Sequence, residues 1–129
     1  MNINSRGFMA TGAVLAAVWV GLSAWSNHGP MALQAPPAWH SALSLHIVHA
    51  LALLVLGLYM AWRPSIWAVA AGMGLLLGLI LFCLTLEIKT LTGASFSTPW
   101  VPWGGSSLIL GWLCWAVACV RPATPMKPF

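Results

Sequence analysis

The sequence predicts an all-α integral membrane protein, a four-helix bundle with both termini on the cytoplasmic side. Of its 129 residues, 60% are hydrophobic and 5% are charged, whereas soluble globular proteins carry about a quarter charged residues. The sequence contains four apolar runs of about 20 residues, the length at which a helix crosses a hydrocarbon core about 30 Å thick. Most of the basic residues lie before the first run, between the second and third runs, or after the fourth run. Four crossings put these positions on one side of the membrane, and such a charge asymmetry orients membrane proteins.

The first predicted helix covers residues 8–25 and follows a short polar segment that contains Arg6. Its apolar stretch is longer than the core of a secretory signal peptide, and no convincing small-x-small cleavage site lies near its end. We therefore expect a helix that stays in the membrane. Small residues recur along it at four-residue spacing, including Gly12 and Gly21, which favours close approach of a neighbouring helix.

Residues 27–39 are predicted to form a loop, because Pro36 and Pro37 interrupt a regular helix. The second predicted helix covers residues 42–62. Ser41 is its expected N-cap, since a serine hydroxyl accepts a hydrogen bond from a free amide at a helix start. The helix should end at the Arg-Pro step that follows it, because the residue before a proline disfavours helical backbone angles.

The third predicted helix covers residues 66–86 and the fourth covers residues 103–120, with a proline-containing loop between them. Glycine weakens a helix in water, but in lipid it permits tight helix contact. We therefore predict that the glycine-rich third helix is the central packing helix. The tail, residues 121–129, is predicted to be disordered. The predicted helix-packing glycines are Gly12, Gly21, Gly72, Gly74, Gly78, Gly104, Gly105 and Gly111.

The charges predict how the chain lies in the membrane. Four crossings place most of the basic residues on one side of the bilayer: Arg6, Arg63, Arg121 and Lys127. Lys89 lies on the other side, where Glu87 offsets its charge. By the positive-inside rule, the more basic side is cytoplasmic. The sequence therefore predicts a multi-pass protein of the bacterial inner (plasma) membrane, with the lipid bilayer as its first partner.

Several classes of function receive no support from the sequence. Five scattered basic residues do not form the clustered stripe that binds nucleic acid. The three cysteines lie in apolar runs without a CxxC pattern, so we interpret them as small packing residues and expect no disulfide framework. The sequence shows neither a phosphate-binding glycine loop nor a nucleophile with a neighbouring base. We therefore predict no catalytic residue, no metal ligand set and no cofactor.

The ionisable side chains near the outer helix ends form a candidate polar cluster. His46 and His49 are three residues apart, so they share one face of the second helix, about one and two turns from its outer end. Glu87, the only acid, reaches the same outer level at the end of the third helix, and His28 follows the first helix there. A carboxylate that faces lipid is costly. We therefore expect Glu87 to turn inward and pair with His46 or His49.

Three interpretations of this cluster stay open. In the first, His28, His49 and Glu87 form a polar clasp that locks the outer helix ends together. In the second, the cluster is an ionisable site that serves a proton or a small solute. In the third, it binds a metal or haem, and bis-histidine haem would need ligands on facing helices, such as His28 with His49.

Four segments occur in an order that resembles a known family. They are SAWSNHG at 23–29, HALALL at 49–54, GLILFCLTLEIKTLTG at 78–93 and PWGGSSLILGW at 102–112. Over about residues 10–120, the chain resembles the four-helix membrane family called domain of unknown function 423, to which some small eukaryotic transmembrane proteins are similar. The resemblance implies the same four-helix fold and supplies no activity. His46 and Glu87 depart from it, since the family usually has glutamine and tyrosine at these positions.

From these observations we predict a non-enzymatic structural or accessory membrane protein that acts through helix contacts. Its partners would be further copies of itself, in a homo-oligomer, or a larger membrane complex, because its small-residue faces exceed what one small bundle needs. The alternatives are a protein that conducts protons or small solutes and a metal- or haem-binding membrane subunit. Either alternative would use the polar cluster of His28, His46, His49 and Glu87.

Overall fold

The computed structural model describes residues 2–122, so most of the tail predicted to be disordered lies outside the described residues. The helices are α1 (Ile3–Ser26), α2 (Met31–Gln34), α3 (Pro37–Trp62), α4 (Ile66–Gly78), the π-helix η1 (Leu79–Leu84), α5 (Thr85–Thr92) and α6 (Val101–Val120). Four stretches of the described chain are long and apolar enough to cross a membrane: α1, α3, the continuous helix of α4, η1 and α5, and α6. The predicted all-α architecture with four spans is confirmed.

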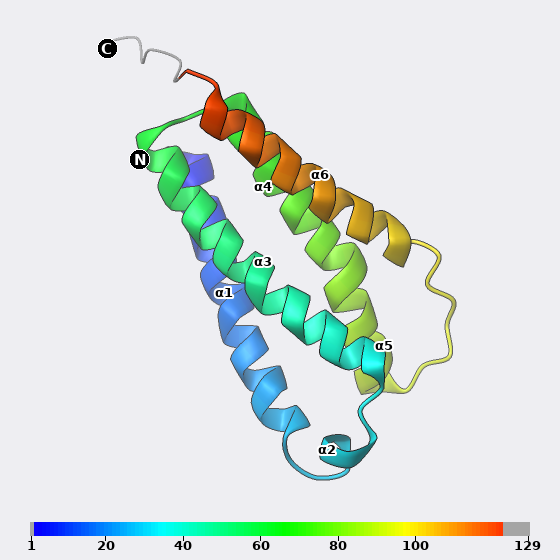
Figure 1. Ribbon diagram of the computed structural model, residues 1–129. Coiled ribbons are helices and arrows are strands. Elements are labelled where there is room, and N and C mark those ends of the chain that lie inside the picture. The colour runs from blue at the N-terminus through cyan, green and yellow to red at the C-terminus, as the bar shows by residue number, and fades with distance from the viewer. Residues whose placement is uncertain (1, 123–129) are drawn as a thin grey trace.

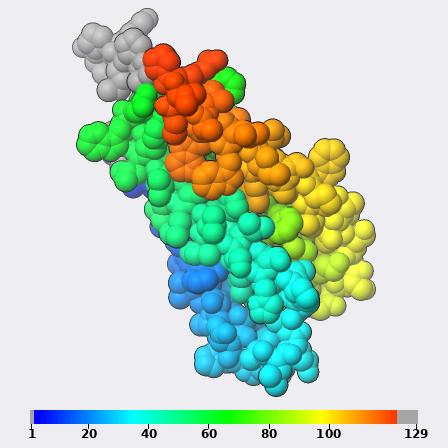
Figure 2. Space-filling view, in the orientation of Figure 1, coloured from blue at the N-terminus to red at the C-terminus, as the bar shows by residue number. Residues whose placement is uncertain are grey.

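The four spans are arranged as two helix pairs. α1 packs along α3 and α4 packs along α6, while α3 also contacts α4, η1 and α5. Figure 1 shows the start of α1, the α3–α4 connection and the end of α6 at one end of the bundle, and α2 and α5 at the other. In the same orientation, the surface of α3 lies between those of α1 and α6 (Figure 2). The most buried span is therefore α3, rather than the third span that the sequence favoured.

Helix α3 begins at Pro37 rather than at residue 42. Proline suits the first position of a helix, because that position needs no N–H partner and the fixed φ of proline is already helical. Pro36 precedes it in an extended conformation, and no side chain caps the helix. The predicted cap at Ser41 is therefore wrong, because Ser41 lies inside the helix. The short helix α2 also lies within the predicted loop.

A π-helix interrupts the third span before its last two turns. The hydroxyl of Thr85 donates to the carbonyl oxygen of Ile80, five residues earlier, at 3.2 Å. The wider turns of a π-helix offset the angular drift that every fourth residue accumulates in an α-helix. As a result, side chains at four-residue intervals stay buried along one row: Leu75, Leu79, Cys83 and Glu87. The π-helix thus keeps Glu87 on the inner row of the span.

Glycines at close helix approaches form the seams within the two pairs. In the α1–α3 seam, a Cβ atom on Gly12 would lie 2.6 Å from the carbonyl oxygen of Ala50. In the second pair, a Cβ atom on Gly104 of α6 would lie 2.7 Å from the backbone nitrogen of Phe82. No side chain fits at these distances without a shift of the backbone. Six of the predicted packing glycines lie at close approaches: Gly12, Gly72, Gly74, Gly78, Gly104 and Gly111. Of these, Gly72 of α4 lies against the ring of Phe8 on α1 and therefore belongs to a contact between the pairs.

Two predicted packing glycines make no such approach. A Cβ atom on Gly21 or Gly105 would meet no heavy atom of the described chain within 4 Å. Gly57, which the sequence analysis did not select, lies against α1, where a Cβ atom would come within 2.8 Å of the carbonyl oxygen of Ser5. The spacing of small residues therefore indicates which helices approach closely. It does not show which small residues lie at a helix contact inside the bundle.

Candidate functional site

The side chain of His46 on α3 contacts the side chain of Glu87 on α5. Nδ1 of His46 lies 2.7 Å from Oε1 of Glu87, and the exposed fractions of the two side chains are 0% and 2%. Of the two histidines with which Glu87 was expected to pair, the structure places His46 against it. We call these two residues the His46–Glu87 pair.

The second ring nitrogen of His46 fixes the proton count of the pair. Nε2 lies 3.0 Å from the backbone carbonyl oxygen of Leu15 on α1. A carbonyl only accepts hydrogen bonds, so Nε2 must carry a hydrogen. A further hydrogen must lie in the 2.7 Å contact between Nδ1 and Oε1. The His46–Glu87 pair therefore holds two protons and has no net charge, whichever residue holds the second one.

This neutrality explains how the only acid is accommodated between apolar helices. An isolated charge costs several kcal/mol in a bilayer, and a pair without net charge avoids most of that cost. Through the carbonyl of Leu15, His46 also links α1 to α3 and α5. The pair is therefore a three-helix connection within the half of the bundle that is predicted to face outward.

His49, one turn further along α3, is bonded to a different helix. Its Nδ1 lies 2.6 Å from the carbonyl oxygen of Leu45, and its Nε2 accepts a hydrogen bond from the indole Nε1 of Trp112 on α6 at 3.1 Å. The carbonyl only accepts and the indole only donates, so His49 is neutral with its hydrogen on Nδ1. Both ring nitrogens are occupied, and neither is free to bind a metal ion.

Further side-chain bonds connect α3 with its neighbours. The indole Nε1 of Trp19 on α1 donates to the carbonyl oxygen of Leu43 at 2.9 Å. Near the other end of α3, the hydroxyl of Tyr59 donates to the carbonyl oxygen of Ala118 on α6 at 2.8 Å. That carbonyl lies four residues before Pro122, which has no N–H to donate to it. Tyr59 therefore satisfies a carbonyl that the end of α6 leaves open.

The remaining predicted histidine lies apart from this network. His28 is exposed in the turn after α1, and no described contact joins it to His46, His49 or Glu87. The structure therefore does not bring together the predicted clasp of His28, His49 and Glu87. The cluster divides into the His46–Glu87 pair and a separate contact between His49 and Trp112.

The geometry gives no support to the two alternative functions. Within the described residues, no group of three or more His, Cys, Asp or Glu side chains is placed to hold a metal ion, and His28 is exposed in the turn after α1. In the half of the bundle predicted to face the cytoplasm, the described core is apolar, with buried side chains that include Leu53, Leu56, Met60 and Leu75. Beyond His49, α3 carries no further histidine or acid. The one titratable side chain on α3 beyond His49 is Tyr59, and its hydroxyl donates to the carbonyl oxygen of Ala118.

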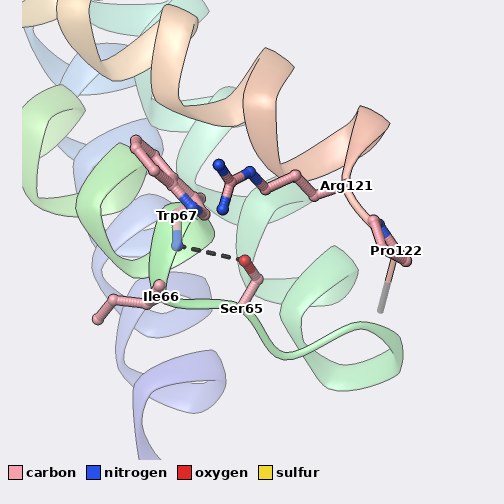
Figure 3. A pocket seen from close by; sticks show the side chains of 5 residues that line it. All are labelled: Ser65, Ile66, Trp67, Arg121 and Pro122. Atoms are coloured by element: carbon pink, nitrogen blue, oxygen red, sulfur yellow. Dashed lines mark hydrogen bonds between the residues drawn. The ribbon is translucent and has the colours of Figure 1, made fainter. Parts of the chain in front are cut away.

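Two hollows lie near the ends of the bundle. The hollow near the end predicted to be outer, here called the outer hollow, has a volume of about 460 Å³ and is lined by residues of α2, the start of α3, and α5 with the turn after it. The hollow at the opposite end has a volume of about 290 Å³. There the guanidinium of Arg121 lies 5.1 Å from the ring centre of Trp67, whose backbone N–H is capped by Ser65 (Figure 3). This second hollow lies where the end of α6 packs against the start of α4.

Comparison with known proteins places this chain among membrane proteins. The family described as "Protein of unknown function (DUF423)" matches residues 22–105, which include both members of the His46–Glu87 pair. The "UPF0382 membrane protein YwdK" of Bacillus subtilis is 32% identical over 119 residues, which cover 88% of this chain and 96% of that protein. The "UPF0382 membrane protein SERP0230" of Staphylococcus epidermidis is 31% identical over 117 residues, which cover 88% and 95%. No solved structure matches the chain.

Proposed function

We propose a function from one premise: the chain belongs to the family described as Protein of unknown function (DUF423), as the resemblance predicted. It is a multi-pass bacterial membrane protein. Its proposed role is non-enzymatic. The chain, residues 1–129, acts as one transmembrane domain through helix contacts, either in a homo-oligomer or as an accessory subunit of a larger membrane complex.

The free face of α1 is the observation that carries this proposal. Only 11% of the apolar window of α1 is buried within the described chain, compared with 44% for α3. Ala13, Ala17 and Gly21 follow one another at four-residue spacing and are all exposed. Small residues at this spacing let helices approach closely in lipid. The face therefore suits another transmembrane helix.

The hydrogen bonds made by the polar side chains support the non-enzymatic part of the proposal. Both ring nitrogens of His46 and of His49 are engaged in hydrogen bonds that join helices or stabilise α3. The hydroxyl of Ser107 on α6 donates to the carbonyl oxygen of Gly74 on α4 at 2.8 Å. These groups stabilise helix contacts and present no nucleophile beside a free base.

The proposed orientation places both termini in the cytoplasm. Arg6, Arg63 and Arg121 belong to the end of the bundle where α1 starts and α6 stops (Figure 1), while Lys127 lies outside the described residues. Arg63 Nη2 donates to the carbonyl oxygen of Arg121 at 3.2 Å, which brings two of these residues together. A reporter fused after Phe129 should have cytoplasmic activity, and strong activity on the outer side would overturn the orientation.

Cross-linking in native membranes tests the proposed helix contact. Ala17→Cys, in a variant whose three native cysteines are replaced by alanine, should form a disulfide-linked homodimer if the partner is a second copy. For an accessory subunit, affinity purification in mild detergent should instead give one stoichiometric partner by mass spectrometry. A chain that is monomeric and without a partner in both experiments would refute the proposal.

A matched pair of glycine variants assigns the contact to α1. Gly21→Leu adds a bulky side chain to the exposed face of α1 and should reduce the cross-link or the partner yield by about tenfold. Gly105→Leu is the control, because Gly105 also lacks a neighbour within 4 Å but belongs to α6. Equal loss in both variants would assign the effect to folding rather than to the face of α1.

A further inference from the structure

Two buried polar atoms of the described chain have no hydrogen-bond partner: the indole Nε1 of Trp39 and the carboxyl Oε2 of Glu87. The exposed fraction is 0% for Trp39 and 2% for Glu87. The first atom only donates hydrogen bonds. The second is the free oxygen of the His46–Glu87 pair and is available as an acceptor. Buried polar groups are rarely left without a partner, so each of these atoms calls for one.

The two atoms belong to the same region of the fold. Trp39 lies seven residues before His46 on α3, so both residues share one helix face, about two turns apart. Glu87 is bonded to His46, and the third span runs back from Glu87 toward the outer end. Both unpartnered atoms are therefore associated with the outer half of the same face of α3.

The outer hollow lies next to both residues in the chain. Its lining includes Pro36 and Ala38, which shortly precede Trp39, and Leu86, which precedes Glu87. Its volume of about 460 Å³ is far more than one water molecule needs, since the share of a water molecule in the liquid is about 30 Å³. A short chain of water molecules fits such a space.

We propose that water enters from the outer hollow and binds between Trp39 and Glu87, accepting from the indole N–H and donating to Oε2. A neutral molecule is required, because the His46–Glu87 pair already has no net charge. A cation would face the indole donor, and an anion would face the carboxyl oxygen. Water supplies both an acceptor and a donor at the smallest size.

The proposed site opens toward one side of the membrane only. Below it, the bonds of His49 to Leu45 and Trp112 are followed by the buried apolar core of Leu53 and Leu56. The His46–Glu87 pair would therefore be in contact with water from the outer side and closed toward the other side. This inference does not depend on the proposed helix-contact function.

Hydrogen exchange of the indole groups tests the proposal. The full chain, labelled with ¹⁵N and placed in lipid nanodiscs, would be transferred to D₂O and followed by NMR. The indole N–H of Trp39 should show a cross-peak to water and should exchange about tenfold faster than that of Trp19, which is bonded to Leu43 and opens only with local unfolding. Trp39→Phe assigns the signal by its loss.

A variant that fills the hollow separates water entry from general loosening. Ala38→Trp should slow exchange of the Trp39 indole to the rate of Trp19, whereas Ala116→Trp, on the exposed face of α6, should leave it unchanged. Slow exchange of Trp39 in the unaltered chain would overturn the proposal and would indicate that the neighbouring ring of Trp25, 6.0 Å away, shields the N–H. Fast exchange that Ala38→Trp leaves unchanged would overturn the proposed entry from the hollow.

Discussion

The close backbone approach at Gly12 within the α1–α3 pair and the polar contacts that join α3 to the second helix pair use different chemistry. Within the α1–α3 pair, Gly12 brings backbone against backbone beside Ala50. Between α3 and the second helix pair, the contacts are made by long polar side chains. Glu87 contacts His46, and the indole of Trp112 donates to His49. The approach at Gly12 therefore depends on the size of the residue, and these two cross-pair contacts depend on their hydrogen-bonding groups. Substitutions that change one property at a time distinguish the two.

The largest expected effect comes from leaving one member of the His46–Glu87 pair without its partner. Glu87→Leu removes the carboxyl group that Nδ1 of His46 contacts at 2.7 Å. We expect the free energy of unfolding to fall by about 3–5 kcal/mol, measured by denaturation with sodium dodecyl sulfate in mixed micelles. Glu87→Gln can still donate a hydrogen bond to Nδ1 and should cost about 1 kcal/mol. Equal losses in the two variants would contradict the pairing.

The second largest loss of stability is expected when one methyl group is added at a close helix approach. Gly12→Ala adds one methyl group where a Cβ atom would lie 2.6 Å from the carbonyl oxygen of Ala50. We expect a loss of about 1–3 kcal/mol from overpacking. The control is Gly21→Ala in the same helix, where no heavy atom of the described chain lies within 4 Å, and a change within about 0.5 kcal/mol is expected. Similar effects at both positions would remove the distinction between seam and free face.

A smaller effect is expected from the second cross-pair contact. Trp112→Phe keeps an aromatic ring but removes the N–H that donates to Nε2 of His49 at 3.1 Å. We expect a loss of about 1 kcal/mol, within the range measured for hydrogen bonds between membrane helices. Trp103→Phe, at an exposed position of α6, is the control for the substitution itself. If the two variants unfold alike, the indole of Trp112 has no role in joining the pairs.

The smallest expected effect lies near the end of α6. Tyr59→Phe removes the hydroxyl that donates to the carbonyl oxygen of Ala118 at 2.8 Å. The expected loss is about 0.6 kcal/mol, the average for a hydrogen bond between membrane helices. The same denaturation measurement applies. A loss as large as that of Glu87→Leu would show that the two ends of α3 are joined equally strongly.

The four spans and the inward turn of Glu87 could be predicted because each follows from the cost of exposing polar groups to lipid. Apolar runs of about 20 residues have few alternatives to crossing the bilayer. A lone acid near the end of such a run must find a partner or reach the interface. Hydropathy and charge therefore identified the spans, and the depth of His46 and Glu87 limited which groups could meet.

The remaining details depend on helix rotation and backbone geometry, which composition does not encode. The π-helix at Leu79–Leu84 sets the face of Glu87, yet its sequence is an ordinary apolar run. His28 lies at the depth of the cluster but in an exposed turn, so equal depth did not mean contact. The carbonyl of Leu15 and the indole of Trp112 were missed as partners. A backbone acceptor leaves no mark in a sequence, and the chain has nine tryptophans from which to choose.

A double-mutant cycle on His46 and Glu87 tests most directly whether these two side chains join α3 to the second helix pair. His46→Leu, Glu87→Leu and the double variant would be unfolded under the same conditions. Because either single variant leaves a buried polar group without a partner, the double variant should lose less stability than the sum of the two, by about 2 kcal/mol. Losses that add within about 0.5 kcal/mol would mean that the two side chains do not interact.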